Sequence, residues 1–205
     1  MHSIENLFSV PLFKTNYGTI SDDERQVVDR YLIDVYQNTN NYSSVESYIL
    51  DKELPELRKF IEESIVTYVE NIIIGNEYDQ DKLSFNITQS WLNLSTPGQS
   101  HHKHMHQNSV ISGVFYFNTN LNDGITFRNP IPAQTIEIPP KSYNHYNSGA
   151  WRVLVNEGDL IMFPSHLYHQ VEQVMGGKNR VSLSFNVFPR GTIGSSDALT
   201  ELKIN

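Results

Sequence analysis

Cysteine is absent from this chain of 205 residues. Disulfide bonds and thiolate metal sites are therefore excluded, so a bound metal ion would need histidine and carboxylate ligands. Long apolar runs are also absent, since no stretch approaches the 18 residues that indicate a membrane-spanning helix. The beginning of the chain has no basic segment followed by an apolar one, as a secretion signal would. We therefore expect a cytoplasmic protein without membrane partners.

Positive charge is scarce. Lysine and arginine number 15 against 23 acidic residues, which gives a net charge of −8. A surface this negative repels phosphates, so we expect no nucleic-acid partner. The hydrophobic content of 39% and the charged content of 19% are ordinary for a globular protein. The length suits a single domain over residues 1–205 with a proper hydrophobic core.

The first part of the chain predicts one strand and a helix. Residues 4–13 are apolar and interrupted by Pro11, which favours a strand at a sheet edge. Ser21 and Glu24 have the spacing of a capping box, which predicts the start of a helix. Apolar residues then recur at helical spacing to about Gln37.

A second helix is predicted from about Lys52 to Ile74. Pro55 is compatible with its first turn, and Gly75 is typical of a helix end. We expect its apolar stripe to pack on the protein's own sheet. Residues 1–80 are thus predicted to be an N-terminal strand and helical support.

From residue 81 to residue 192 the pattern changes to short apolar runs separated by turn residues, and residues 193–205 form a small polar tail. Seven or more short strands in about a hundred residues indicate a sandwich, barrel or jelly roll. The predicted strands are residues 85–94, 110–117, 124–127, 135–138, 151–155, 159–163 and 180–188.

Four of the eight histidines fall within six residues. In an extended chain His102, His104 and His106 would share one face, while His101 would point to the other. Two histidines at positions i and i+2 can bind one metal ion facially. No acid lies at the second position of the pair, because the sequence reads His-Met-His. The alternative is an exposed histidine-rich loop that collects zinc or nickel adventitiously.

A later stretch offers a further ligand and a cation. His169 follows a turn, a strand and a proline, which would hold it at the mouth of a strand. Arg180 begins an alternating strand that places Arg180, Ser182, Ser184 and Asn186 on one face. A guanidinium with hydroxyl groups suits a carboxylate ligand. The alternative is an edge strand whose polar face meets solvent.

The whole pattern resembles the iron(II)- and 2-oxoglutarate-dependent oxygenases, in which two close ligands precede a distant histidine and an arginine. More narrowly, it is similar to a bacterial and phage group of putative 2-oxoglutarate oxygenases. The motifs that carry the resemblance are Leu7-Phe8 with Pro11, Trp91 with Asn93, His104-Met105-His106, residues 112–116 (Ser-Gly-Val-Phe-Tyr), and residues 158–165 followed by His169.

The resemblance implies a mainly β fold with flanking helices, in which N-terminal helices buttress a double-stranded β-helix (jelly roll, cupin-like). It implies iron(II) on His104, His106 and His169, with His101 and His102 as neighbours. It also implies 2-oxoglutarate as cosubstrate, with its distal carboxylate on Arg180 and Ser182, and dioxygen as the oxidant. By strand position, Asn93 and Asn186 would contact the cosubstrate as well.

The implied activity couples decarboxylation of 2-oxoglutarate to oxidation of a small-molecule or peptidyl substrate, with hydroxylation as the default outcome. A missing acidic ligand can free a coordination position for halide in related enzymes, but His106 can fill it here. Two other interpretations stay open. A cupin-like three-histidine dioxygenase without 2-oxoglutarate leaves Arg180 without a purpose. A non-catalytic β-sandwich, such as a phage structural or binding protein, predicts no stoichiometric iron. The substrate and the oligomeric state cannot be predicted from the sequence, and neither can the choice between a substrate-lining and a loop role for residues 143–146 and Trp151.

Overall fold

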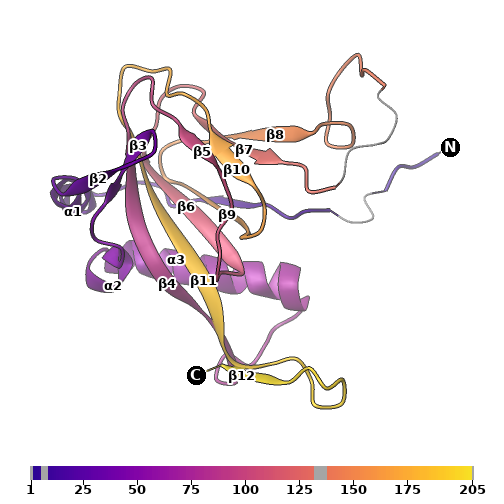
Figure 1. The fold of residues 1–205 in the computed structure, drawn as a ribbon. Helices are drawn as coiled ribbons and strands as arrows, with labels where there is room; N and C mark the ends of the chain where they lie inside the picture. Colours follow the sequence, from indigo (N-terminus) through magenta and orange to yellow (C-terminus); the bar gives the residue numbers. More distant parts are fainter. Residues whose placement is uncertain (1, 6–8, 132–137, 205) are drawn as a thin grey trace.

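The computed structural model describes residues 2–5, 9–131 and 138–204. Two antiparallel sheets face one another (Figure 1). The larger sheet has the order β1-β9-β6-β11-β4-β3-β2, with β12 (Leu202–Ile204) added to β11, and the smaller has the order β5-β10-β7-β8. The predicted strand at residues 135–138 lies mostly outside the described residues, and Ile138 itself is in no strand.

Eight strands form the double-stranded β-helix, and this confirms the predicted fold. Strands β4, β6, β9 and β11 belong to the larger sheet, whereas β5, β7, β8 and β10 belong to the smaller one, so the chain crosses repeatedly between the two layers. This is the jelly-roll arrangement. The bounds are β4 Leu83–Ser95, β5 His101–His104, β6 Ile111–Asn118, β7 Gly124–Arg128, β8 Ala150–Leu154, β9 Asp159–Pro164, β10 His169–Val171 and β11 Arg180–Ile193.

The predicted N-terminal strand was placed too early. Among the described residues of 4–13, only Phe13 is in a strand, because β1 runs over Phe13–Asn16 and pairs with β9. Proline lacks the N–H that a ladder needs, and β1 accordingly begins after Pro11.

The first helix, α1, is shorter than predicted. Its capping box is present as expected: Ser21 accepts from the Glu24 N–H, and the Glu24 side chain accepts from the Ser21 N–H. However, α1 covers only Asp22–Tyr31, and the chain then enters a hairpin of β2 (Val35–Asn38) and β3 (Asn41–Ser44). The hairpin lies on the outer edge of the larger sheet.

The second predicted helix consists of three pieces. A short helix α2 (Ile49–Lys52) precedes α3 (Pro55–Tyr68), and the last turn, η1 (Val69–Ile74), is a π-helix. Leu54 adopts a left-handed conformation between α2 and α3, while Pro55 begins α3 and Gly75 ends η1 with a positive φ, as predicted. No described helix is long and apolar enough to span a membrane.

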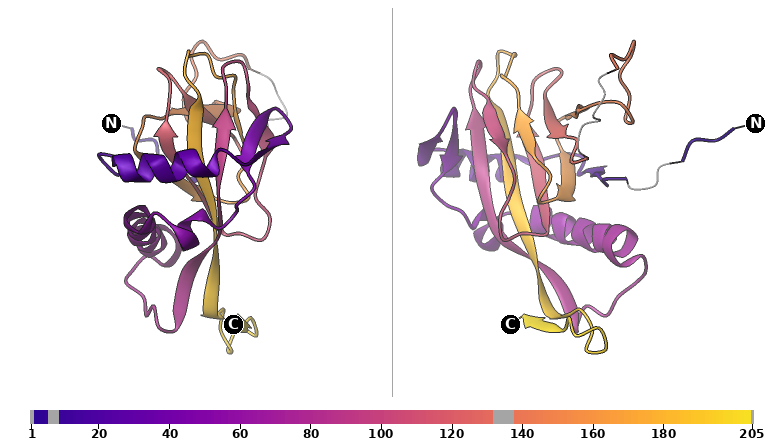
Figure 2. Two further views of the ribbon diagram at one scale, coloured as in Figure 1. Left: turned by 90° about the vertical axis from the view of Figure 1, so that its left-hand side faces the viewer. Right: turned by 45° about the vertical axis from the view of Figure 1, so that its right-hand side comes forward.

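Two apolar cores hold the layers together. One lies between the helices and the larger sheet and includes Ile61 of α3 together with Leu183 and Phe185 of β11. The other lies between the two sheets and includes Tyr116 of β6 and Phe163 of β9. Figure 2 shows α3 crossing the larger sheet on the side away from β5 and β10. The helices therefore support one face of the larger sheet and leave its other face toward the smaller sheet.

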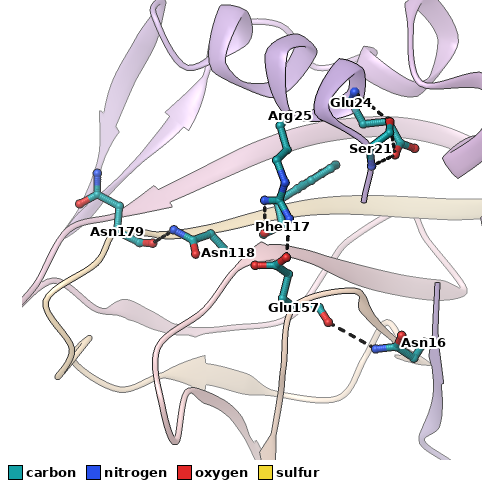
Figure 3. A network of polar contacts seen from close by, with 8 residues as sticks. All are labelled: Asn16, Ser21, Glu24, Arg25, Phe117, Asn118, Glu157 and Asn179. Carbon is teal, nitrogen blue, oxygen red and sulfur yellow. Dashed lines mark hydrogen bonds and ion pairs between the residues drawn. The ribbon is translucent and has the colours of Figure 1, made fainter. Parts of the chain in front are cut away.

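Helix α1 is attached to the sheet by polar contacts (Figure 3). Arg25 donates to the carbonyl oxygen of Phe117 at 3.3 Å and forms an ion pair with Glu157. Asn16 donates to the carbonyl oxygen of Glu157, which links β1 to the same corner.

Candidate metal and cosubstrate site

Three histidines, one from β5, one from the loop that follows it and one from β10, lie close together between the two sheets. His104 lies directly opposite His169 in the ladder, and His106 follows β5. One ring nitrogen of each histidine lies within 4.8 Å of those of the other two. His169 is only 3% exposed, and the other two are half-buried. This spacing allows one ion to be bound by three imidazoles.

Each of these rings is oriented by a hydrogen bond from Nδ1. His104 donates to the carbonyl oxygen of His102 at 2.8 Å, and His169 donates to that of Leu167 at 3.0 Å. His106 is 2.6 Å from Oδ1 of Asn186. Because these oxygen atoms only accept, each Nδ1 carries the proton and each Nε2 is left with a lone pair for a metal.

Burial keeps the cluster neutral. Burial and the neighbouring histidines lower the pKa of His169 to about 3. Burial likewise lowers the pKa of His104 to about 4, although its hydrogen bond to His102 acts in the opposite direction. The pKa of His106 is also lowered, chiefly by burial. Neutral imidazole is the form that binds metal, so the cluster can bind metal without first losing protons at neutral pH.

The predicted alternation of the histidines was wrong for His101. His101 was expected to point away, yet its ring stacks on His104 with a centroid distance of 4.5 Å. His102 was expected to share the face of His104, and its exposed ring lies beside that of His104 at a centroid distance of 5.1 Å. Strict alternation fails because β5 contains only four residues, and its pairing with β10 is irregular between His169 and Val171.

The polar row on β11 lies as predicted, on the face toward the smaller sheet. Its apolar neighbours Val181, Leu183, Phe185 and Val187 all belong to the core under the helices. Arg180 is 4% exposed, and Ser182 and Ser184 are also buried. The alternative of a solvent-facing edge strand is excluded, because β11 lies between β6 and β4.

Arg180 is a buried cation with little compensation. It donates to the carbonyl oxygen of Gly124 at 3.3 Å, and its guanidinium carbon lies 5.2 Å from the ring centre of Tyr116. No carboxylate of the described residues forms an ion pair with it. The Tyr116 hydroxyl is buried and lacks a hydrogen-bond partner within the described part of the chain. A buried charge and a buried hydroxyl are costly in this state unless a ligand compensates them.

The two asparagines are already hydrogen-bonded within the protein. Asn93 accepts from Ser43 at 3.2 Å and donates to Ser184 at 2.9 Å, which ties β3, β4 and β11 together. Asn186 accepts from His106 and, at 3.1 Å, from Ser112. Contacts of either asparagine with a cosubstrate stay a prediction.

Residues 89–186 match the model of a family described as putative 2OG-Fe(II) oxygenase. These residues form a 2OG-Fe(II) oxygenase core. The matched segment begins in β4 and ends in β11, and it contains the three histidines and Arg180. No curated protein matches the sequence.

Solved structures of 2OG-Fe(II) oxygenases have the same fold. A Pseudomonas putida prolyl-4-hydroxylase has a TM-score of 0.55 at 14% identity, covering 89% of this chain and 95% of its own. The epimerase SnoN, solved with Fe3+ and alpha ketoglutarate, has a TM-score of 0.58 at 11% identity, covering 89% and 81%. HygX from Streptomyces hygroscopicus, solved with nickel, 2-oxoglutarate and hygromycin B, has a TM-score of 0.55 at 10% identity, covering 87% and 82%.

The 2OG-Fe(II) oxygenase core uses iron(II), 2-oxoglutarate and dioxygen, and the chain is an enzyme. The family match thus decides against a three-histidine dioxygenase without 2-oxoglutarate and against a non-catalytic β-sandwich. The described residues fit both iron and 2-oxoglutarate. Three free Nε2 atoms suit iron, and the uncompensated pair of Arg180 and the Tyr116 hydroxyl suits a carboxylate.

Sequence reasoning missed two neighbours of this oxygenase site. Tyr116 could have been found, because it lies an even number of residues after Ser112 on a strand and so shares its inward face. Trp91 was noticed only as part of a motif, yet its indole stacks on His106 at a centroid distance of 5.8 Å. That contact could not be predicted, because it depends on where the loop after β5 places His106.

Proposed function

We propose that His104, His106 and His169 bind the iron of this oxygenase through their Nε2 atoms. The observation that supports this most strongly is the set of three Nδ1 hydrogen bonds, which orient all three rings toward one point. The histidine at the second position takes the place of the usual acid, so the ligand set carries one negative charge less than the standard triad. Iron bound there supplies the oxidising chemistry with dioxygen and 2-oxoglutarate.

We propose that Arg180 and Ser182 bind the distal carboxylate of 2-oxoglutarate. The two residues share the inward face of β11, and both are buried. Arg180 can form charge-assisted hydrogen bonds to the carboxylate, and the Tyr116 hydroxyl can donate one more. Carboxylate binding at this position would orient the cosubstrate toward the histidines and compensate the buried guanidinium.

Hydroxylation of a small-molecule or peptidyl substrate is the proposed reaction. A cavity of about 430 Å³ adjoins His106 and is lined mainly by apolar residues, including Tyr68, Ile72, Met105 and Pro164. Neither His104 nor His169 lines this cavity, so it would receive a part of the substrate away from the metal, and its lining favours an apolar group there. A cytoplasmic location is also part of this proposal.

Turnover without added substrate tests these roles. The protein should form succinate from 2-oxoglutarate when iron(II) and dioxygen are present. His106→Ala should weaken iron binding by at least about tenfold and reduce turnover accordingly. Arg180→Ala should retain iron but require much more 2-oxoglutarate. The exposed His145, in the loop before β8, gives a matched control. His145→Gln should change neither the iron affinity nor the concentration of 2-oxoglutarate that turnover requires. Full iron affinity in His106→Ala would contradict the assignment of that ligand.

A further inference from the structure

A second group of three histidines lies beside the proposed iron ligands and shares one member with them. The ring centres of His101, His102 and His104 are 4.5 to 5.1 Å apart. One ring nitrogen of each lies within 4.8 Å of those of the other two, the same limit that the proposed iron ligands meet. We propose that these three histidines form a second site for a divalent cation of the zinc class, in competition with iron for His104.

The ring nitrogens of His101 and His102 are available for this role. Within the described part of the chain, neither ring forms a hydrogen bond, whereas Nδ1 of His104 donates to the carbonyl oxygen of His102. His104 therefore has one nitrogen left as a ligand and can bind one ion at a time. Three imidazoles suit zinc, copper or nickel better than magnesium or calcium, which prefer oxygen.

The second site can be reached from solvent. His102 is exposed, and both His101 and His102 line an open cavity of about 550 Å³ on the rim of the smaller sheet. Glu172 lines the same cavity, and its buried Oε2 atom lies 3.9 Å from Nε of Arg152, with which it forms an ion pair. Lys103 and Arg152 also line it and oppose a cation. The three imidazoles are therefore the proposed ligands, and the one carboxylate in the lining is already paired with Arg152.

The second site should be the weaker of the two. The iron ligands are oriented by Asn186 and by the Leu167 carbonyl, whereas His101 and His102 have no such support within the described chain. A hydrogen bond that orients a ligand increases the affinity for the metal, and its loss typically lowers that affinity by roughly 10- to 100-fold. Because the two sites share His104, a zinc ion bound at the second site would withdraw that ligand from the iron, and the weaker second site would fill only when zinc is in large excess over iron. This consequence rests on the proposed function through the role of His104.

Zinc titration of metal-free protein by calorimetry tests the second site. His169→Gln removes one proposed iron ligand and leaves His101, His102 and His104 intact, so it should still bind one zinc ion. The double variant His169→Gln/His102→Gln should bind zinc at least about tenfold more weakly than His169→Gln. His102→Gln alone should keep the tight binding of the wild type. Circular dichroism and thermal melting check that each variant folds, and His106→Gln provides a second background because His169 is buried.

Two results would overturn the second site. One is equal zinc affinity in His169→Gln with and without His102→Gln. The other is complete loss of zinc binding in both the His169→Gln and the His106→Gln backgrounds. His145→Gln, made in the same backgrounds, should have no effect. Unchanged tight zinc binding in His169→Gln and His106→Gln would instead contradict the proposed iron ligands, and the comparison with His102→Gln would still decide the second site.

Discussion

At the scale of single residues, Arg180 is the most informative side chain outside the histidines. It is buried without an ion-pair partner in the described chain, so its charge is best explained by an anionic ligand. We predict that Arg180→Ala weakens 2-oxoglutarate binding about 10- to 100-fold, because a charge-assisted hydrogen bond contributes about 1.5–3 kcal/mol. Calorimetric titration of the metal-loaded protein measures this. Arg180→Lys should recover only part of the affinity, since one ammonium cannot replace a bidentate guanidinium.

Asn186 supports the second metal ligand. Its Oδ1 atom accepts from His106 and from Ser112, which in turn is 2.9 Å from the Ser165 hydroxyl. We predict that Asn186→Leu weakens iron binding about 10- to 100-fold by releasing the ring of His106. Asn186→Asp keeps an acceptor and should retain most of the affinity. Quenching of the fluorescence of Trp91, which stacks on His106, can report the binding.

The result for Asn186→Leu separates positioning from cosubstrate binding. A positioning residue changes the affinity for the metal alone, measured before any 2-oxoglutarate is added. If Asn186→Leu left metal affinity unchanged and weakened only 2-oxoglutarate binding, Asn186 would be a cosubstrate contact and not a support for His106. Ser182→Ala is the matched control on the same strand, and it should leave metal affinity intact.

Residue-level prediction from the sequence was accurate where a long strand fixes the side-chain direction. The inward row from Arg180 to Asn186 follows from alternation, because β11 extends over many residues and is paired on both sides. The histidine stretch lies partly outside a strand, and alternation therefore misplaced His101. The hydrogen bond between His106 and Asn186 joins residues far apart in sequence, and only the folded structure brings them together.

At the scale of elements, β6 must pass very close to its neighbour β11. A Cβ atom built on Gly113 would lie 2.1 Å from the Phe185 ring, which is fully buried. We predict that Gly113→Ala lowers the free energy of unfolding by about 1–3 kcal/mol through overpacking. Chemical denaturation measures this. Gly149→Ala is the control, because a Cβ at Gly149 meets nothing within 4 Å. Equal stability of both variants and the wild type would contradict the close packing of β6 on β11.

Asp159 links β1 to β9 and makes a pH-dependent contribution to the stability of the fold. Burial alone would raise its pKa, but hydrogen bonds from Asn16, Lys14 and the Asn156 N–H outweigh this and lower the pKa. A lowered pKa in the folded state stabilises the fold above the ordinary pKa, and the contribution is lost as the pH falls through the folded-state value. Asp159→Asn should therefore cost about 1–3 kcal/mol at pH 7.

That difference from the wild type should shrink as the pH falls below the ordinary carboxyl pKa and the Asp159 carboxyl becomes protonated. Urea denaturation at several pH values checks the trend. The exposed Asp197 provides the control, since Asp197→Asn should have little effect at any pH. A cost that stayed constant down to the lowest pH would show that packing, and not charge, explains the role of Asp159.

Element boundaries followed from the sequence where local chemistry sets them. The capping box fixed the start of α1, and Pro55 and Gly75 marked the start of α3 and the end of η1. The end of α1 was missed because residues 35–38 continue an apolar spacing, yet they pair with β3 as a strand. Tertiary pairing overrides helical periodicity in such short segments.

At the scale of the whole molecule, both sheets contribute residues to the site. The helices cover one face of the larger sheet, and the site lies between its other face and the smaller sheet (Figure 1). The smaller sheet contributes His104 and His169, while the larger sheet contributes Arg180. The metal and cosubstrate positions therefore depend on the packing of both sheets. The family pattern could be predicted from the spacing of these residues, whereas the second histidine group could not.

The most direct test is anaerobic addition of iron(II) and then 2-oxoglutarate, followed by visible absorption. If the proposed site is right, the wild-type protein develops the charge-transfer band of the chelate at one iron per chain. The band should weaken strongly in Arg180→Ala at the same 2-oxoglutarate concentration, and it should be lost in His106→Ala. A wild-type protein that binds iron without developing the band, or an equally strong band in Arg180→Ala, would contradict the proposed arrangement.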